Sequence, residues 1–456
     1  MPQLVVENKN ILLFILSVIL FGLFTIVLIL ENYIMERIIL PFLLSIIISL
    51  LIFLFINKIC KDKFCSKIFL ISILLHFIFI LFWQVLKYHI LGLHIPTLYS
   101  FSDFISDRDA GGYHRDGVYI ANNFSVATLS YHFKGGLFPK LVAFFYYYFT
   151  ANPVIVCLFN GLLGSFTSCI IYLLGRCVLN YDLAKIYSLF CVFSTSFIVH
   201  TSIMIRDSEI MLLTYLSIYL FYKYYTTKKF IYIPLFAISL FLLYSFRAYA
   251  ALCLIGAFIF AFILSNLKFT KHKNQFKLNK LTLCFIILSP VLIFALLFIL
   301  KTLIFSFSLE DLLSLRENGY AGTSSDYPWT FDSLFRIFPL LPFIVGYLCF
   351  LFSPFPYEWF ALKRIHYIPD TLILYLFIPS FLRNIKDVIL NKHFLLSVYL
   401  FAMVIQFFIY SIIVASSGNV FRLRGPFIPM IYLIAMYRPD KFLGRILNKI
   451  QQWRIV

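Results

Sequence analysis

Long apolar runs recur along the whole chain, separated by short polar stretches. Each run is close to the roughly 20 residues that a helix needs to cross a bilayer. Backbone groups in lipid must be satisfied internally, and the runs lack the alternation of barrel strands, so they predict helices. The sequence therefore predicts an all-α, polytopic integral membrane protein with about twelve transmembrane helices in one transmembrane domain, residues 1–456. The expected spans are 11–31, 37–57, 67–90, 153–175, 184–204, 208–226, 230–246, 248–267, 281–305, 367–383, 394–415 and 425–440.

Composition supports this assignment and excludes a soluble protein. The chain is 62% hydrophobic and only 13% charged, whereas a soluble domain of this length needs far more charge on its surface. Its net charge of +18 would suggest a nucleic-acid partner in a soluble protein. Here the excess of Lys and Arg in short loops follows the positive-inside rule, so no nucleic acid is expected.

The positions of the basic loops predict the orientation. These loops all fall on one side of the membrane if both termini are cytoplasmic. The residues concerned are Lys58, Lys61, Lys63, Lys67, Arg176, Lys185, Lys223, Lys228, Lys229, Lys268, Lys271, Lys273, Lys277, Lys280, Lys441, Arg445, Lys449 and Arg454.

Two large segments then lie on the outer side, residues 91–136 and 306–366, while every inner loop is short. Within the second, residues 337–353 are apolar enough to span, but a single crossing would move the basic tail outside. Pro339 and Pro342 also argue against a regular span, so a re-entrant element is expected there. Long ordered loops usually carry function, and we therefore expect the site in these segments.

The first outer segment is acidic around residues 103–116. A carboxylate beside a membrane can act as a general base, and Asp109 or Asp107 is the expected catalytic residue. Tyr113 and His114 follow directly and are expected to bind a glycan. The alternative is a solvated loop in which Asp side chains cap short helices.

Arginine is the main basic residue on the outer side, whereas lysine dominates the inner side. The positive-inside rule gives no reason for outer arginines, and the planar guanidinium suits phosphate. We therefore expect them to bind the diphosphate of a lipid carrier that holds a sugar, although they could instead extend to lipid headgroups. The arginines concerned are Arg206, Arg247, Arg316, Arg422 and Arg424.

Three of these arginines have a local interpretation. Arg206 and Asp207 interrupt two apolar helices and could simply pair and cap the turn. Arg422 and Arg424 are interpreted as part of a tight loop over 417–426, because Gly418 and Gly425 flank them.

The second outer segment has a polar stretch, 316–326, that could close over a bound glycan. Tyr320 and Trp329 would offer stacking faces for sugar rings, although a plain hydrated loop is equally compatible. No nucleotide-binding, zinc-protease or hydrolase motif occurs. We therefore expect no cofactor and no metal ion.

The stretch Asp109-Ala110-Gly111-Gly112-Tyr113 resembles the Asp-Glu-x-x-Tyr pattern of the GT-C superfamily of membrane glycosyltransferases, with Ala110 in place of Glu. The layout of the whole chain resembles bacterial O-antigen and capsular repeat-unit polymerases (Wzy-type). The resemblance implies a GT-C-like fold in the bacterial inner membrane and an undecaprenyl-diphosphate-linked oligosaccharide as substrate. It further implies contact with membrane lipid and a chain-length regulator protein as partner.

Two other functions remain open from the sequence. One is a GT-C enzyme that adds a single lipid-carried sugar to a lipid or protein, whose site would look almost the same. The other is a lipid-linked oligosaccharide flippase, which should carry charges inside its spanning helices and short loops on both sides. The long outer segments favour an enzyme.

Overall fold

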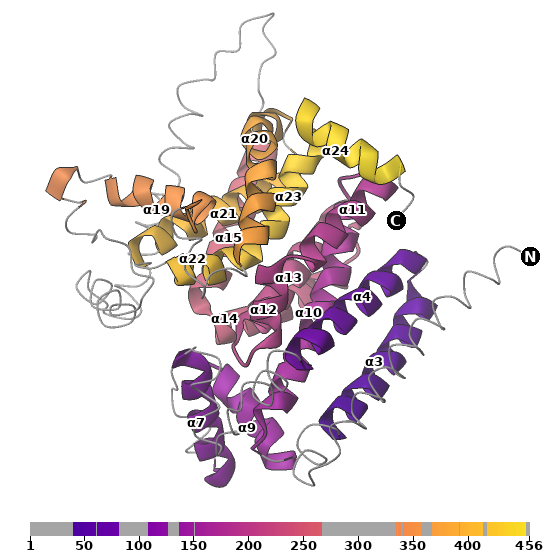
Figure 1. Cartoon of the computed structure of the whole chain (residues 1–456). Coiled ribbons are helices and arrows are strands. Elements are labelled where there is room, and N and C mark those ends of the chain that lie inside the picture. The colour runs from indigo at the N-terminus through magenta and orange to yellow at the C-terminus, as the bar shows by residue number, and fades with distance from the viewer. Residues whose placement is uncertain are drawn as a thin grey trace, which may run out of the picture. The chain divides into compact units, whose positions relative to one another are not determined.

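Helices make up the regular structure throughout the part of the chain that the computed structural model describes. That part comprises residues 40–60, 62–81, 108–125, 136–149, 151–266, 334, 336–338, 341–356, 367–391, 393–413 and 417–452. The all-α prediction is confirmed for these residues (Figure 1). The helices are α3 (Leu40–Ile59), α4 (Lys63–Phe79), α7 (Arg108–Asn122), α9 (Phe138–Tyr148), α10 (Pro153–Arg176), α11 (Tyr181–Val192), α12 (Thr195–Ser202), α13 (Asp207–Thr227), α14 (Tyr232–Phe246), α15 (Ala248–Asn266), α19 (Leu341–Phe352), α20 (Ile368–Leu390), α21 (Phe394–Ile413), α22 (Ser417–Arg424), the short η5 (Gly425–Phe427), α23 (Ile428–Tyr437) and α24 (Lys441–Gln452).

The chain divides into two compact units. The first, here called the N-terminal unit, comprises residues 1–166 and 201–208. The second, the C-terminal unit, comprises residues 167–200 and 209–456. The expectation of one membrane domain over 1–456 stays a prediction.

The N-terminal unit contains two packed helix pairs, α3 with α4 and α7 with α9. A buried histidine in α4 ties this unit together. The Nδ1 of His76 lies 2.6 Å from the Ser72 carbonyl oxygen, and its Nε2 lies 2.6 Å from the Thr201 hydroxyl. Gly164 of α10 makes room for the ring, since a Cβ there would lie 2.6 Å from His76 Nε2. Both ring nitrogens of His76 therefore have hydrogen-bond partners within the protein.

The C-terminal unit is built around α21 and α23. Helix α15 packs on α21, α20 packs on α23, and α19 and α11 pack on the same two helices. Two buried tyrosines hold the start of α23. The Tyr215 hydroxyl donates to the Pro426 carbonyl (2.6 Å), and the Tyr187 hydroxyl donates to the Pro429 carbonyl (3.1 Å). These bonds fix where the chain turns into α23.

Three helices of the described chain are long and apolar enough to cross a membrane: Leu40–Lys58, Pro153–Arg176 and Ala248–Ser265. A fourth span results if α11 and α12 count as one, although they are bent by 55°. The expected spans 11–31 and 281–305 lie outside the described residues. The structure is thus that of a helical protein suited to a membrane, while the number of spans stays a prediction.

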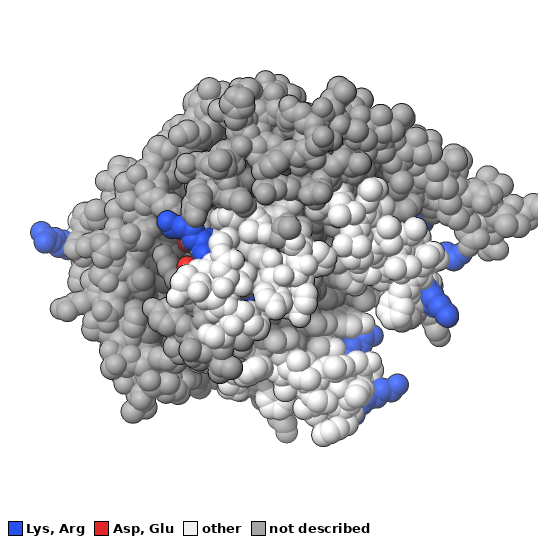
Figure 2. Space-filling model, turned by 90° about the horizontal axis from the view of Figure 1, so that it is seen from below, with Lys and Arg blue, Asp and Glu red and all other residues white. Residues whose placement is uncertain are grey.

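Apolar side chains on the outside of these helices fit the same conclusion. Helix α3 exposes Leu40, Leu51 and Phe55, and α14 exposes Phe241, each by more than half of its surface. Exposing such apolar surfaces to water would be unfavourable, whereas lipid acyl chains are as apolar as these side chains. Figure 2 shows one face on which most described surface atoms belong to neither basic nor acidic residues.

Two expected spans differ from the structure. The span 184–204 is interrupted at Phe193 and Ser194, where a new helix begins because a buried carboxylate binds its first amide groups. The span 425–440 is represented by α23, which has only 10 residues. It ends at Tyr437 because Pro439 disfavours helical geometry at Arg438, whose backbone is extended (φ −142°, ψ 83°).

The interpretation of residues 417–426 as a tight loop is wrong. Residues Ser417–Arg424 form helix α22. Gly418 lies in its first turn, where glycine is tolerated, and no proline interrupts the following residues. The break comes only at Pro426, which lies at the start of η5. Glycines at both ends of a polar stretch therefore did not define a loop.

Candidate functional site

The acidic outer segment forms helix α7, which lies against α9 in the N-terminal unit. The two helices approach closely at Gly117. A Cβ at this position would lie 2.5 Å from Val142 Cγ1 and 3.5 Å from the Tyr146 ring. Glycine thus permits the contact that positions the whole acidic helix.

Substituting Gly117 with Ala should destabilise the protein by about 1–3 kcal/mol. The new methyl group would overlap Val142, whose β-branched side chain has one strongly preferred rotamer in a helix. Gly112 is the matched control, because it lies in the same helix and a Cβ there meets nothing within 4 Å. Gly112→Ala should stabilise by up to about 1 kcal/mol through helix propensity alone. Thermal unfolding of both variants in detergent measures the two changes in stability. Equal changes for Gly117→Ala and Gly112→Ala would contradict the close contact between Gly117 and Val142.

Asp109 and Asp116 occupy one face of α7, with Gly112 between them. The three positions are separated by three and four residues, which places them along one side of a helix. Both carboxylates are half-buried, and Asp109 lies in the first turn, where the helix dipole favours a negative charge. This face can therefore present a carboxylate to a hydroxyl group. Asp107 lies outside the described residues.

Both Tyr113 and His114 are buried. His114 lies on the opposite side of α7 from the two carboxylates, whereas Tyr113 lies on their side, four residues after Asp109 and three before Asp116. The Tyr113 ring packs edge-on against Phe138, with ring centroids 5.0 Å apart. The Nδ1 of His114 lies 2.8 Å from the Tyr146 hydroxyl, which donates to Met204 Sδ at 3.4 Å. Both residues thus hold α7 in place, and a role in binding a glycan stays a prediction.

Burial raises the pKa of the Asp116 carboxyl above its ordinary value, while the charge of Arg115 acts in the opposite direction. A carboxyl whose pKa is raised in the folded state favours folding at acid pH. This contribution to the stability of the protein is lost as pH rises through the folded-state pKa. Asp116→Asn should therefore gain stability relative to the wild type above that pKa. Unfolding of both proteins at acid and neutral pH measures this. A stability difference that does not change with pH, or that changes in the opposite direction, would exclude the raised pKa.

Exposed aromatic side chains gather near this helix pair, at the end of α7 and along α9. The ring centroids of Phe124 and Tyr147 are 5.1 Å apart, and those of Phe144 and Tyr148 are 5.0 Å apart. All four side chains are more than half exposed. We call these four residues the aromatic surface. Flat amphipathic rings of this kind suit sugar rings or the headgroup region of a membrane.

Arg206 lies in the turn between α12 and α13 and is half-buried. Asn160 of α10, which the sequence did not single out, fixes this turn. Its side-chain amide donates to the carbonyls of Ile203 (2.7 Å) and Ile205 (2.9 Å). Because Met204 also contacts Tyr146, the turn with Arg206 and the α7–α9 pair belong to one connected part of the N-terminal unit.

Asp370, at the start of α20, is the centre of a buried polar cluster in the C-terminal unit. It is 1% exposed. Its carboxylate accepts from the Ser194 hydroxyl (2.8 Å) and from the backbone amides of Thr195 (2.8 Å) and Ser196 (2.6 Å). These amides belong to the first turn of α12, which needs acceptors outside the helix. Asp370 therefore positions the N-terminus of α12.

Arg424 lies in the same cluster and is fully buried. Its Nη1 donates to the carbonyls of Ser353 (2.6 Å) and Phe350 (3.1 Å), at the end of α19, and its charge acts on Asp370. Arg422, in the same helix, is half-buried. Arg424 thus joins α22 to the end of α19, and its role in binding a diphosphate stays a prediction.

Arg247 lies between α14 and α15 and is 6% exposed. Its guanidinium is 5.6 Å from the centroid of the Tyr249 ring, and its charge acts on Tyr410. Tyr410 stacks on Phe350 at 5.5 Å, the residue whose carbonyl accepts from Arg424. The C-terminal unit therefore brings Arg247 and Arg424 to the same aromatic cluster.

The predicted site residues are thus found in two groups. Asp109, Tyr113, His114 and Arg206 belong to the N-terminal unit, and Arg247, Arg422 and Arg424 belong to the C-terminal unit. Arg316, Tyr320 and Trp329 lie outside the described residues, like Asp107. Asp370 is the main residue that sequence reasoning missed, although a carboxylate directly after Pro369 at the start of an apolar helix was a usable signal.

No protein-family model matches the sequence, and no curated protein matches it.

Proposed function

We propose that the protein is a membrane glycosyltransferase that acts on undecaprenyl-diphosphate-linked glycans at the outer face of a bacterial inner membrane. In this proposal it has a GT-C-like fold with about twelve spans and joins O-antigen or capsule repeat units. The observation that carries the proposal is the half-buried carboxylate of Asp109 at the start of α7; the aromatic surface lies at the other end of the same helix pair. A carboxylate can take the proton of a sugar hydroxyl, and aromatic rings elsewhere on the same helix pair can stack on a glycan.

The proposed reaction is a glycosyl transfer between two lipid-linked glycans. Asp109, or Asp107 in its place, takes the proton of an acceptor hydroxyl. The hydroxyl oxygen bonds to the anomeric carbon of the donor glycan, and the bond between that carbon and the diphosphate oxygen breaks. Undecaprenyl diphosphate leaves, and its negative charge is stabilised by the outer arginines.

The membrane setting supports a lipid-linked substrate. Apolar side chains cover the outside of α3 and α14, so a substrate with a polyprenyl tail reaches the protein from within the bilayer. The polar glycan and diphosphate then lie at the membrane surface. A half-buried carboxylate on α7 therefore fits an enzyme with a lipid-linked substrate better than an enzyme with a soluble substrate.

A flippase for lipid-linked oligosaccharides is the second candidate, and a specific observation favours it. Transporters commonly contain broken helices and charges buried among their spans. The described chain contains the bent pair α11–α12, and Asp370 and Arg424 are buried beside its break. In our interpretation these charges stabilise the break. A GT-C enzyme that transfers one sugar to a lipid or protein is a variant of the first candidate.

Reconstitution with a purified substrate separates these functions. The protein in liposomes would be given undecaprenyl-diphosphate-linked repeat units, and glycan length and released undecaprenyl diphosphate would be measured. Our proposal predicts longer glycans and one released carrier for each bond formed. A single transfer to another acceptor would indicate the single-sugar enzyme. Movement of unchanged substrate between leaflets would contradict the proposal and indicate a flippase.

A further inference from the structure

Helix α24 is amphipathic and is held firmly on the C-terminal unit. Leu443 and Leu447, four residues apart, are buried where α24 meets α11 and α20. Asp440 fixes the start of the helix, since its carboxylate accepts from the Leu443 amide (2.7 Å). The Asp440 amide in turn donates to the Ser380 hydroxyl of α20 (2.9 Å). One face of α24 is thus fully committed to packing.

The other side of α24 is basic. Lys441, Arg445 and Lys449 are exposed and repeat every four residues, so they form one stripe along the helix. Phe442 lies next to this stripe and is 62% exposed. An exposed aromatic ring beside a row of cations is typical of helices that lie in the plane of a membrane surface.

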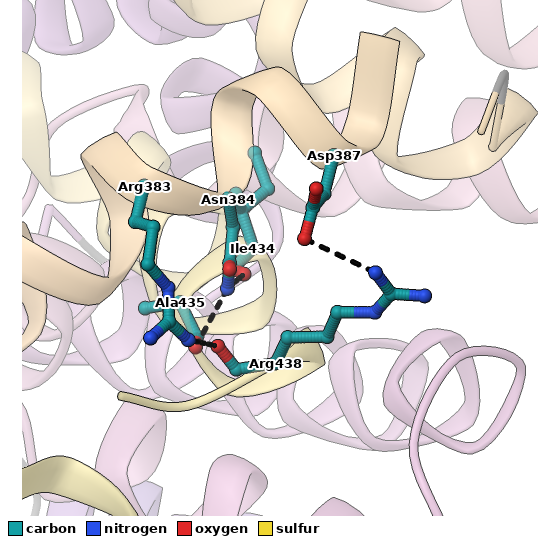
Figure 3. A network of polar contacts seen from close by, with 6 residues as sticks. All are labelled: Arg383, Asn384, Asp387, Ile434, Ala435 and Arg438. Atoms are coloured by element: carbon teal, nitrogen blue, oxygen red, sulfur yellow. Dashed lines mark hydrogen bonds and ion pairs between the residues drawn. The ribbon is translucent and has the colours of Figure 1, made fainter. Parts of the chain in front are cut away.

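A network of polar contacts joins α20 to the end of α23 just before α24 begins (Figure 3). Arg438 pairs with Asp387 of α20 (3.1 Å), and Arg383 donates to the Arg438 carbonyl. Asn384 donates to the carbonyls of Ile434 (2.8 Å) and Ala435 (3.1 Å), which lie in the last turn of α23. These bonds satisfy carbonyls that a helix end leaves open, and they fix the angle at which α24 leaves α23.

Charge around this corner is strongly one-sided. The segments 383–387 and 438–452 contain two acidic residues, Asp387 and Asp440, both used in the bonds just described. They contain six basic residues: Arg383, Lys386, Arg438, Lys441, Arg445 and Lys449. The excess positive charge complements a phosphate-bearing surface.

We propose that α24 is a binding site for anionic phospholipid headgroups. Its basic stripe binds the lipid phosphates, and Phe442 inserts at the boundary between headgroups and acyl chains. The buried face of α24 packs on α20 and α11, so no further protein is needed to cover Leu443 and Leu447. This inference concerns the membrane surface and does not depend on the proposed glycosyl transfer.

The test compares hydrogen exchange of residues 441–452 in nanodiscs of phosphatidylcholine alone and of phosphatidylcholine mixed with phosphatidylglycerol. We expect slower exchange with phosphatidylglycerol. Lys441→Gln with Arg445→Gln should remove this difference, because each basic residue near an anionic surface strengthens binding about fivefold. Lys228→Gln with Lys229→Gln is the matched control, since it removes two exposed charges from another loop of the same unit.

A variant that keeps the positive charges tests whether charge itself, and not the identity of the side chain, determines lipid binding. Lys441→Arg with Lys449→Arg retains both charges and should retain the difference between lipids. Equal exchange in the two lipids for the wild type would overturn the proposal. So would an equal loss in the Lys228/Lys229 control, because it would show a general effect of protein charge.

Discussion

Replacing Asp109 by Asn should lower glycosyl transfer by about 100- to 10,000-fold while the protein still folds and inserts. The amide has nearly the size of the carboxylate but cannot accept the proton of the acceptor hydroxyl. Asp109 is half-buried in the first turn of α7, and its replacement leaves the buried contacts of Tyr113 and His114 unchanged. The loss should therefore appear in the reaction rate, while stability should fall by no more than about 1 kcal/mol, the contribution of a negative charge at a helix N-terminus.

The control for this experiment is Asp182→Asn, the same chemical change at an exposed residue that pairs with Lys185. It should leave transfer unchanged. If Asp107→Asn abolishes transfer and Asp109→Asn does not, Asp107 is the base. If neither variant lowers the rate, no carboxylate at these two positions acts as the base, and the proposed mechanism is wrong.

Replacing Asp370 by Asn should destabilise the protein by about 1–3 kcal/mol. The carboxylate accepts three hydrogen bonds at the start of α12, and an amide cannot accept all of them. The change also removes the negative charge that acts on the fully buried Arg424. The buried donors that lose their acceptor are the main part of the expected loss.

Asp387→Asn offers a matched comparison within the same helix. Asp387 also pairs with an arginine, Arg438, but the two side chains are 35% and 54% exposed. An exposed pair contributes little, so this change should cost less than about 1 kcal/mol. Denaturant unfolding in detergent measures both variants. Similar losses for Asp370→Asn and Asp387→Asn would mean that burial of Asp370 does not determine its contribution.

Apolar run length was a reliable guide to helix position. The run predicted over 153–175 is helix α10, Pro153–Arg176, and the run over 248–267 is α15, Ala248–Asn266. These helices depend on local composition, which a sequence displays directly. The ends of α10 also follow local signals, with Pro153 at its first position.

The interruption at Phe193–Ser194 could not be predicted in this way. It depends on Asp370, which is far away in the sequence and binds the amides of Thr195 and Ser196. No local breaker occurs in this run, so the sequence predicted one continuous helix. The prediction for residues 417–426 failed for the opposite reason. Two glycines suggested a loop, whereas residues Ser417–Arg424 form helix α22.

The candidate site was predictable by residue type but not by burial. The sequence selected Tyr113, His114 and Arg424 for their chemistry, and the structure buries all three among other side chains. Whether a polar residue in such a segment faces a ligand or its own fold depends on tertiary contacts. The His114–Tyr146 and Arg424–Ser353 bonds each join separate elements, which no local pattern reveals.

The most direct test of the proposed function is the surface polysaccharide of a strain that lacks this gene, separated by size on a gel. Our account predicts single repeat units on their lipid anchor, with the full ladder restored by the wild-type gene and not by the Asp109→Asn variant. An unchanged ladder in the deletion strain would contradict the account. Repeat units that accumulate inside the cell and are absent from its surface would contradict it as well, and would identify a flippase instead.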